Sequence, residues 1–379
     1  PFLSIGGGTG YRQLQPKLAL SSDDGSRVTI AAEWVVTNPG FQPSELRHTS
    51  FFPWSSWPAS TLAPSYLADF DGGGSFAIDQ TPGDHFGLLF TQQTGPVGLF
   101  NVRFIPEMVP DSGTVAPSIT IDPQGSRAVM LAESNGQSLL AYERVVAGSH
   151  QLFFGVGGPL ANGAYYTGST PVGCASGGLS AGAAPYGTGW VVALNNATFL
   201  GDPACPNNIG PATDVQLATV DAMGVITPGP TIPGAQTIRR VATTPRSDGL
   251  WVVWREQSMA AQPPIHVMRY DPALGAILGP FDPLTAQDQA LGPLAVGSLG
   301  DHLVLAWVVD PAQNPSTIAL TIFDQDGLAL VKTSFKTTGQ ANGPFSILGS
   351  PQADSVVVAW SEDAGQGDVV RVARFDCTL

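Results

Sequence analysis

The chain has 379 residues and a net charge of −14, with 43% hydrophobic residues, 45 Gly, 33 Pro and only 12% charged residues. The hydrophobic share excludes a disordered polymer, and the negative charge excludes the basic surface that nucleic-acid binding requires. No apolar stretch is long enough for a membrane-spanning helix, so we expect no membrane insertion.

The N-terminal part combines a short apolar segment, 1–5, with a first strand-like run, 26–32. Throughout the chain, apolar residues form short runs rich in Val, Leu and Trp, bounded by Gly, Pro, Asp and Asn, which is a strand pattern. The sequence starts at Pro1 rather than Met, as expected if a secretion or lipoprotein signal is removed from the mature protein.

An aromatic cluster follows in the stretch 51–57, where Phe51, Phe52, Trp54 and Trp57 surround a proline. No other part of the chain repeats this stretch. Exposed aromatic side chains of this kind stack on sugars or on partner side chains, so these four residues are candidate ligand-binding residues. The alternative is a loop that folds back as a hydrophobic plug.

Two carboxylates, Asp69 and Asp71, precede a run of three glycines. Alternating acids with a following glycine are typical of calcium loops, so this pair is a candidate metal site and calcium its candidate ion. Two acids supply fewer than the six oxygens that calcium prefers, and a tight turn explains the same pattern.

Three cysteines are present, and none forms a CxxC pair that would indicate zinc. Cys174 and Cys205 flank a segment rich in Gly, Pro and Asn, and we expect a disulfide between them. A disulfide indicates an oxidising, extracytoplasmic setting, such as the periplasm, the cell surface or the medium. Cys377 is then the odd thiol.

The segment 178–182 matches the GxSxG pattern of serine hydrolases around Ser180. That pattern works on a strand–turn–helix elbow with a histidine and an acid nearby, and no helix follows here. We interpret it as a glycine-rich inner strand. No other motif names a reaction, so the sequence favours a non-enzymatic protein.

Seven related runs are spread along the chain, and we interpret each as the second strand of a repeat. The last three end in Trp254, Trp307 and Trp360, at intervals of 53 residues (307−254 and 360−307), and we expect these tryptophans to pack between repeats. Further strands surround each run, which predicts four strands per repeat. The runs are 26–32, 84–90, 126–132, 190–194, 248–254, 301–307 and 354–360.

The chain ends supply the remaining strand. Residues after the last run and before the first together make one more repeat length, so the N-terminus should complete the last sheet and remove its open edge. The sequence therefore predicts an all-β fold, a seven-bladed β-propeller of four-stranded antiparallel blades in one domain, 1–379. Its approximate blades are 14–65, 66–115, 116–170, 171–234, 235–289, 290–339 and 340–379 with 1–13.

Carboxylates recur near these runs as Glu33, Glu133, Glu256 and Glu362. A ring of carboxylates could bind cations or act in glycoside hydrolysis. We favour the simpler interpretation that they are solvated strand ends.

The repeat form resembles exported bacterial β-propeller proteins of no fixed function, over essentially the whole chain. The Gly-His and Trp-Asp pairs of WD repeats and the Asp-rich turns of sialidases are missing. We therefore expect a binding or scaffold protein, with a protein or glycan partner contacting loops 38–65 and 197–212. The alternative is a carbohydrate-binding or glycan-active propeller that uses Trp54 and Trp57. A surface low in charge favours self-association.

Overall fold

The structure is a computed structural model. It describes residues 3–4, 11–21, 24–36, 44–54, 65–70, 75–93, 100–109, 117–160, 163–198, 205–206, 209–247, 249–257, 263–271, 273–285, 288, 290, 292–350, 354–363, 365 and 367–377.

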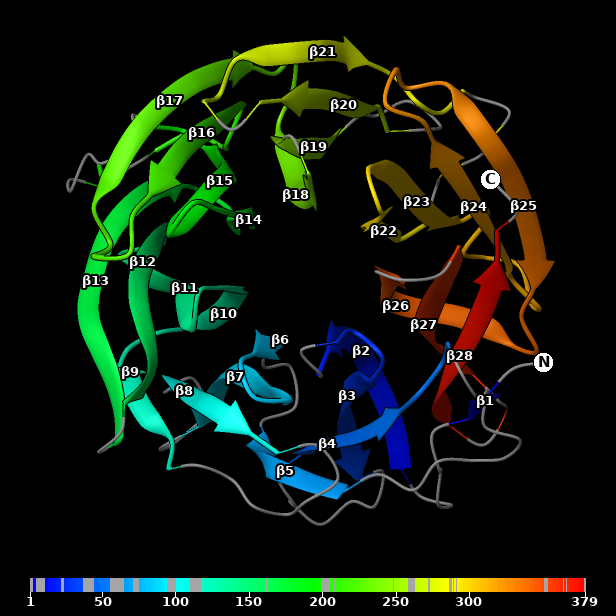
Figure 1. Cartoon of the computed structure of the whole chain (residues 1–379), viewed down its shortest axis with the longest axis horizontal. Coiled ribbons are helices and arrows are strands. Elements are labelled where there is room, and N and C mark those ends of the chain that lie inside the picture. Colours follow the sequence, from blue (N-terminus) through cyan, green and yellow to red (C-terminus); the bar gives the residue numbers. More distant parts are fainter. Residues whose placement is uncertain are drawn as a thin grey trace.

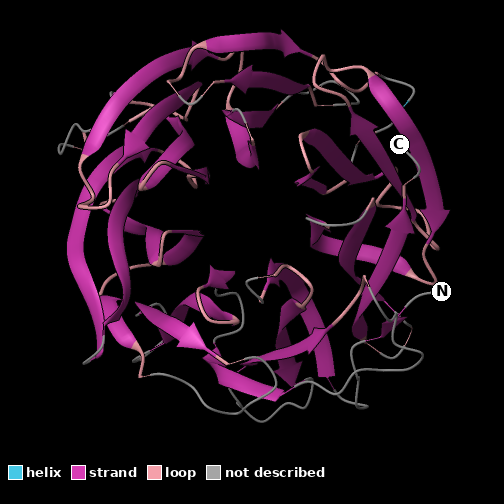
Figure 2. Cartoon of the chain, in the orientation of Figure 1, coloured by secondary structure: helices cyan, strands magenta, loops and turns pink. Residues whose placement is uncertain are grey.

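The described residues form seven four-stranded antiparallel sheets arranged around a central channel, with no α-helix among them (Figures 1 and 2). The chain is thus the seven-bladed β-propeller that the repeats predict. We number the blades 1 to 7 in chain order, beginning with the sheet of β2 to β5.

Each blade runs from the channel to the rim of the ring, and its four strands lie side by side in that direction. From blade 1 to blade 7, the innermost strands are β2 (Tyr11–Leu20), β6 (Phe76–Thr81), β10 (Arg127–Ser134), β14 (Ala181–Tyr186), β18 (Ile238–Arg246), β22 (Leu294–Leu299) and β26 (Gln340–Gly349). The second strands are β3 (Val28–Val36), β7 (His85–Gln93), β11 (Gln137–Val146), β15 (Gly189–Asn196), β19 (Gly249–Glu256), β23 (His302–Val308) and β27 (Ser355–Asp363). The third strands are β4 (Ser44–Phe51), β8 (Phe100–Met108), β12 (Ser149–Leu160), β16 (Asp214–Val220), β20 (Ile265–Tyr270), β24 (Thr317–Phe323) and β28 (Asp368–Asp376). The outermost strands are β5 (Ser65–Phe70), β9 (Ile119–Asp122), β13 (Gly163–Ala175), β17 (Ile226–Pro233), β21 (Ala276–Phe281), β25 (Ala329–Lys336) and β1 (Leu3–Ser4).

The two chain ends share blade 7, as predicted. Leu3 and Ser4 of β1 pair with Val372 and Arg371 of β28, and the Arg371 guanidinium donates to the Ser4 hydroxyl. The last blade therefore joins strands from both ends of the sequence, which closes the ring and pairs the outer edge of β28 at Arg371 and Val372.

The hydrophobic core lies between the blades, with one buried cluster at each of the seven joints within the described part of the chain. Along β27, Val358 and Trp360 face blade 6, whereas Val357 and Ala359 face blade 1. A strand packed on both faces must be apolar at successive positions, which explains the unbroken Val-Val-Trp runs of the sequence.

The recurring tryptophans have the packing role that we expected. Trp254, Trp307 and Trp360 are each at most 3% exposed, and each faces the preceding blade.

One of the seven runs lies on a different strand from the one predicted. Six lie on second strands, but residues 126–132 lie mainly on β10, the innermost strand of blade 3, and β11 is the second strand. Both strands are apolar over most of their length, so hydrophobic pattern alone could not tell which is first.

The disulfide between Cys174 and Cys205 is present, as predicted. Cys174 lies on β13, the outermost strand of blade 3, and Cys205 lies in the connection between β15 and β16 of blade 4. Nearby, the Ala197 amide donates to the Cys174 carbonyl at 3.0 Å. The covalent bond thus links two neighbouring blades, and Cys377 is a buried free thiol.

Within the described residues, the structure holds no helix with the length and apolar character of a membrane span.

Deletion of residues 1–4 tests the closure of the ring. We expect the free energy of unfolding to fall by about 1–3 kcal/mol, because a few backbone hydrogen bonds at about 1 kcal/mol each are lost. The edge of β28 becomes exposed as well, so light scattering should detect more self-association. Chemical denaturation measures the stability, and the control Ser4→Ala, which keeps the backbone pairing, should lose less than about 1 kcal/mol. Equal stability of the deletion variant and the full chain would contradict the closure.

Candidate functional site

The central channel widens into a cavity of about 690 Å³. It extends toward the face of the ring that carries the turns between first and second strands, such as residues 300–301; we call this the lower face. All seven innermost strands contribute to its wall. The wall includes side chains of Leu18, Leu20, Ile78, Asp79, Gln80, Leu131, Glu133, Pro185, Arg246, Val296, Ser298, Ile347 and Leu348.

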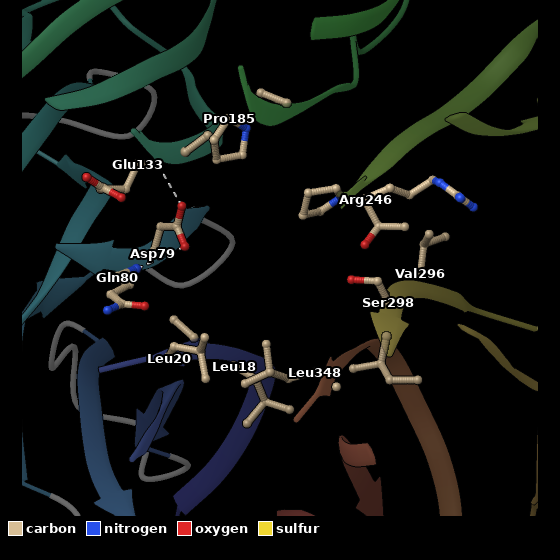
Figure 3. A pocket seen from close by; sticks show the side chains of 18 of the residues that line it. Leu18, Leu20, Asp79, Gln80, Glu133, Pro185, Arg246, Val296, Ser298 and Leu348 are labelled. Carbon is tan, nitrogen blue, oxygen red and sulfur yellow. Dashed lines mark hydrogen bonds between the residues drawn. The ribbon is translucent and has the colours of Figure 1, made fainter. Parts of the chain in front are cut away.

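The wall of the cavity is mainly apolar, with polar groups gathered on two sides. In Figure 3, Asp79, Gln80 and Glu133 lie on one side, and Arg246 and Ser298 lie on the other. Leucine side chains from β2 and β26 lie between these two sides. An apolar cavity of a few hundred Å³ with a small number of polar groups is the usual form of a small-molecule site.

Asp79 is the carboxyl group in the cavity whose titration is most perturbed. Its Oδ2 accepts the Glu133 amide at 2.7 Å, and its Oδ1 accepts the Gln80 amide at 2.9 Å. Burial raises the pKa of Asp79 to about 7, against the two amide hydrogen bonds, and the nearby charge of Glu133 raises it further. Asp79 therefore changes charge near neutral pH and links blade 2 to blade 3.

Arg246 ties the opposite wall together. Its guanidinium donates to the Asp301 carbonyl at 2.9 Å and lies over the ring of Trp251 at 5.2 Å. The Asp301 carboxylate accepts the Ser247 amide and hydroxyl, and these hydrogen bonds hold the pKa of Asp301 below its usual value. Blades 5 and 6 are thus joined at the rim of the cavity by polar contacts.

Three of the four aromatic residues selected from the sequence lie away from this cavity, beside the joint between blades 1 and 7. Phe51 is buried, Phe52 is 40% exposed under the Arg27 guanidinium, and Trp54 is half-buried against the core of that joint. The Trp54 indole donates to the Gly25 carbonyl at 3.0 Å. Trp57 lies outside the described residues, so the aromatic platform stays a prediction.

The proposed metal pair cannot be placed. The backbone of Asp69 pairs with Glu45 on β4, its side chain is not described, and Asp71 lies outside the described residues. No cluster of metal-ligating side chains occurs among the described residues. Calcium at Asp69 and Asp71 stays a prediction.

Three of the four recurring glutamates are not solvated strand ends, contrary to the prediction. Glu33, Glu256 and Glu362 are at most 4% exposed. Glu133 belongs to β10 and lies at the lower face, away from the other three, because the run in blade 3 is an innermost strand. These four carboxylates therefore do not form a ring.

The buried glutamates hold the connections between blades. Glu256 accepts the Ala235 amide at 3.0 Å, and Glu362 accepts the Thr338 amide at 3.2 Å. Burial opposes ionisation of Glu362, but hydrogen bonds from Thr338, Trp360 and Arg371 hold its pKa below the usual value. These two carboxylates therefore accept hydrogen bonds from amides of the loops that connect one blade to the next.

Ser180 of the GxSxG segment is a structural residue. It precedes β14, and its hydroxyl donates to the Val241 carbonyl at 2.9 Å and lies 3.2 Å from the Val241 amide. The serine therefore joins blades 4 and 5, in agreement with its interpretation as part of a small-residue inner strand.

Sequence reasoning named Glu133 but did not select Asp79 or Arg246. The available signal was a single charge within a short first strand, as in 76–81, in a chain with few charges. That signal becomes informative only once the innermost strand of each blade is known.

No protein-family model matches the chain, and no curated protein matches it. Among solved structures, a PL25 ulvan lyase is 10% identical with a TM-score of 0.59, covering 97% of this chain and 95% of that one. The same type of lyase bound to -[GlcA(1-4)Rha3S]- gives 10% identity and a TM-score of 0.58, covering 97% and 94%. A protein of unknown function from Dyadobacter fermentans is 10% identical with a TM-score of 0.50, covering 100% and 98%. At such identities the likeness shows the fold alone.

The raised pKa of Asp79 predicts a specific dependence of stability on pH. The folded pKa of about 7 exceeds the usual value of 3.8, so its contribution is fully present below about pH 4 and is lost as the pH rises through 7. The limiting slope for one group is about 1.4 kcal/mol per pH unit. Asp79→Asn should remove much of this slope between pH 5 and 7, although it loses one amide hydrogen bond at every pH.

Urea denaturation at several pH values measures this slope. Asp326→Asn, at an exposed hairpin turn, is the matched control and should keep the native slope. The same slope in Asp79→Asn and in the native chain would show that Asp79 does not titrate in this range.

Proposed function

We propose that this chain is a non-enzymatic, extracytoplasmic binding protein that holds a ligand in its axial cavity. The observation that carries the proposal is the cavity of about 690 Å³, with a largely apolar wall built from all seven innermost strands. Because those strands are fixed by the core between the blades, the cavity is preformed, which reduces the entropy cost of binding.

The polar groups of the cavity support binding rather than chemistry. Both oxygens of Asp79 accept backbone amides, and Glu133 Oε1 accepts the Gly136 amide at 2.6 Å. A carboxylate held in this way has a fixed position and can accept a hydrogen bond from a ligand, and the protonated carboxyl group of Asp79 can donate one. A ligand with an apolar body and a few polar groups suits such a wall.

The disulfide supports an extracytoplasmic setting. Cys174 and Cys205 are bonded, and disulfides persist in oxidising compartments but are rare in reducing ones.

Filling the cavity tests the proposal. Ser298 points into the cavity in Figure 3, so Ser298→Trp should block it, whereas Thr333→Trp on the exposed strand β25 should not. We expect a neutral apolar dye such as Nile red to bind the native chain and the Thr333 variant. Ser298→Trp should weaken that binding at least tenfold, as measured by fluorescence titration. Equal binding to all three proteins would place the dye elsewhere and refute the axial site.

A second candidate function is carbohydrate binding at the aromatic cluster. It is favoured by the exposure of Phe52 beside the half-buried Trp54, and by the ulvan lyases among the structures that share the fold. An exposed aromatic ring supplies the flat apolar surface on which sugars stack.

Two kinds of substitution separate binding from folding at this cluster. Phe52→Ala should abolish signals on a glycan array while leaving the melting temperature within about 2 °C of the native value, since changes at exposed side chains cost little. Trp57→Ala should weaken the same glycan signals. Trp54→Ala, which loses core packing and the bond to Gly25, should lower the melting temperature instead. Unchanged glycan signals in Phe52→Ala and Trp57→Ala would exclude this function.

A further inference from the structure

Two positively charged residues lie on the innermost strands of separate blades. Lys17 lies on β2 and Arg240 on β18, the innermost strands of blades 1 and 5, and these strands border the central opening on different sides in Figure 1. Both side chains are half-buried. Within the described part of the chain, neither makes a hydrogen bond or an ion pair.

A third cation adjoins them. Arg255 on β19 is the direct cross-strand partner of Arg240, so the two side chains lie on the same face of blade 5. The Arg255 guanidinium donates to the carbonyls of Gly292 at 2.7 Å and Ala290 at 3.0 Å. These contacts fix its position next to Arg240.

The cations perturb one another. Burial, and then the charge of Arg240, lowers the pKa of Lys17 to about 8. Burial, and then the charge of Arg255, lowers the pKa of Arg240. No carboxylate of the described residues is among the groups that shift either pKa.

Such a cluster is unusual in this chain, which has 30 acidic and 16 basic residues. Two arginines elsewhere meet buried carboxylates directly. Arg144 contacts Asp122 at 2.6 Å, and Arg371 contacts Glu362 at 2.8 Å. Although acids are in such excess, Lys17 and Arg240 meet no carboxylate within the described residues, so they are available to an anion from outside the chain.

We propose that the channel binds an oxyanion, the carboxylate, sulfate or phosphate group of an acidic ligand, between Lys17 and Arg240. The inference deepens the proposed binding function and rests on it for the apolar part of the ligand. Leu18, the residue after Lys17, lines the cavity, so an apolar body in the cavity lies next to the cationic level. Lysine supplies a compact charge, and arginine supplies paired donors that match an oxyanion.

Sulfate is the probe for this site. The melting temperature of the native chain is measured in sodium sulfate and in sodium chloride at equal ionic strength, together with Lys17→Met, Arg240→Gln and the control Lys336→Met on the exposed strand β25. Sulfate stabilises folded proteins in general, so the result is the difference between variants. We expect a saturable additional stabilisation in the native chain and in Lys336→Met, with at least tenfold weaker sulfate affinity in the two channel variants.

Two further readouts exclude a merely structural role for these cations. Without sulfate, Lys17→Met and Arg240→Gln should be as stable as the native chain or more so, because each relieves repulsion. Near pH 8.5, calorimetry in two buffers of different ionisation enthalpy should show proton uptake when sulfate binds the native chain, since the anion restores the charge of Lys17, and none for Lys17→Met. Equal sulfate affinity in native and channel variants, or stability loss without sulfate and unchanged affinity, would overturn the proposal.

The neutral dye separates this inference from the proposed function. Lys17→Met should still bind Nile red, and Ser298→Trp should still bind sulfate. Dye binding that is insensitive to Ser298→Trp, with sulfate binding that needs Lys17, would leave the anion site standing and refute the apolar cavity. The reverse pattern would refute the anion site alone.

Discussion

The structure depends on the packing of each blade against both of its neighbours. Residues that alternate along a second strand enter two different core clusters, as Val357 and Val358 do on β27. No blade can bury its two faces alone, so the seven sheets are stable only together, and the ring has to close. The pairing of β1 with β28 is therefore a requirement of the core rather than a detail of the chain ends.

The sequence allowed the fold to be predicted because this packing leaves a clear pattern. Burial on both faces produces unbroken apolar runs, and the tryptophans at intervals of 53 residues mark equivalent positions facing the preceding blade. The pattern is ambiguous in blade 3, where β10 and β11 are similarly apolar and the prediction confuses the innermost strand with the second. The grouping of Glu133 with the other three glutamates is wrong for the same reason. First and second strands run in opposite directions, so their last residues lie at opposite faces of the ring.

The candidate site could not be predicted in the same way. Lys17, Asp79 and Arg240 are separated by long stretches of sequence and share only their position on innermost strands, which all border one axis. Their pKa shifts arise mainly from burial and then from groups that include charges on other strands, which no local motif records. By contrast, the Cys174–Cys205 bond could be predicted, because the two cysteines flank a segment rich in Gly, Pro and Asn.

That bond joins blade 3 to blade 4, whereas blade 7 is completed by the short, non-covalent pairing of β1 with β28. The junction of the chain ends is held by the β1–β28 hydrogen bonds and by the core cluster between blades 7 and 1, without the covalent cross-link that joins blades 3 and 4, so the ring has a preferred place to open. Under mechanical load or heat, the ring should open first at the junction of the chain ends, while the disulfide keeps blades 3 and 4 together. The opened ring would then be an arc of blades with the disulfide near its middle. The two linked blades would offer a nucleus on which the remaining blades repack.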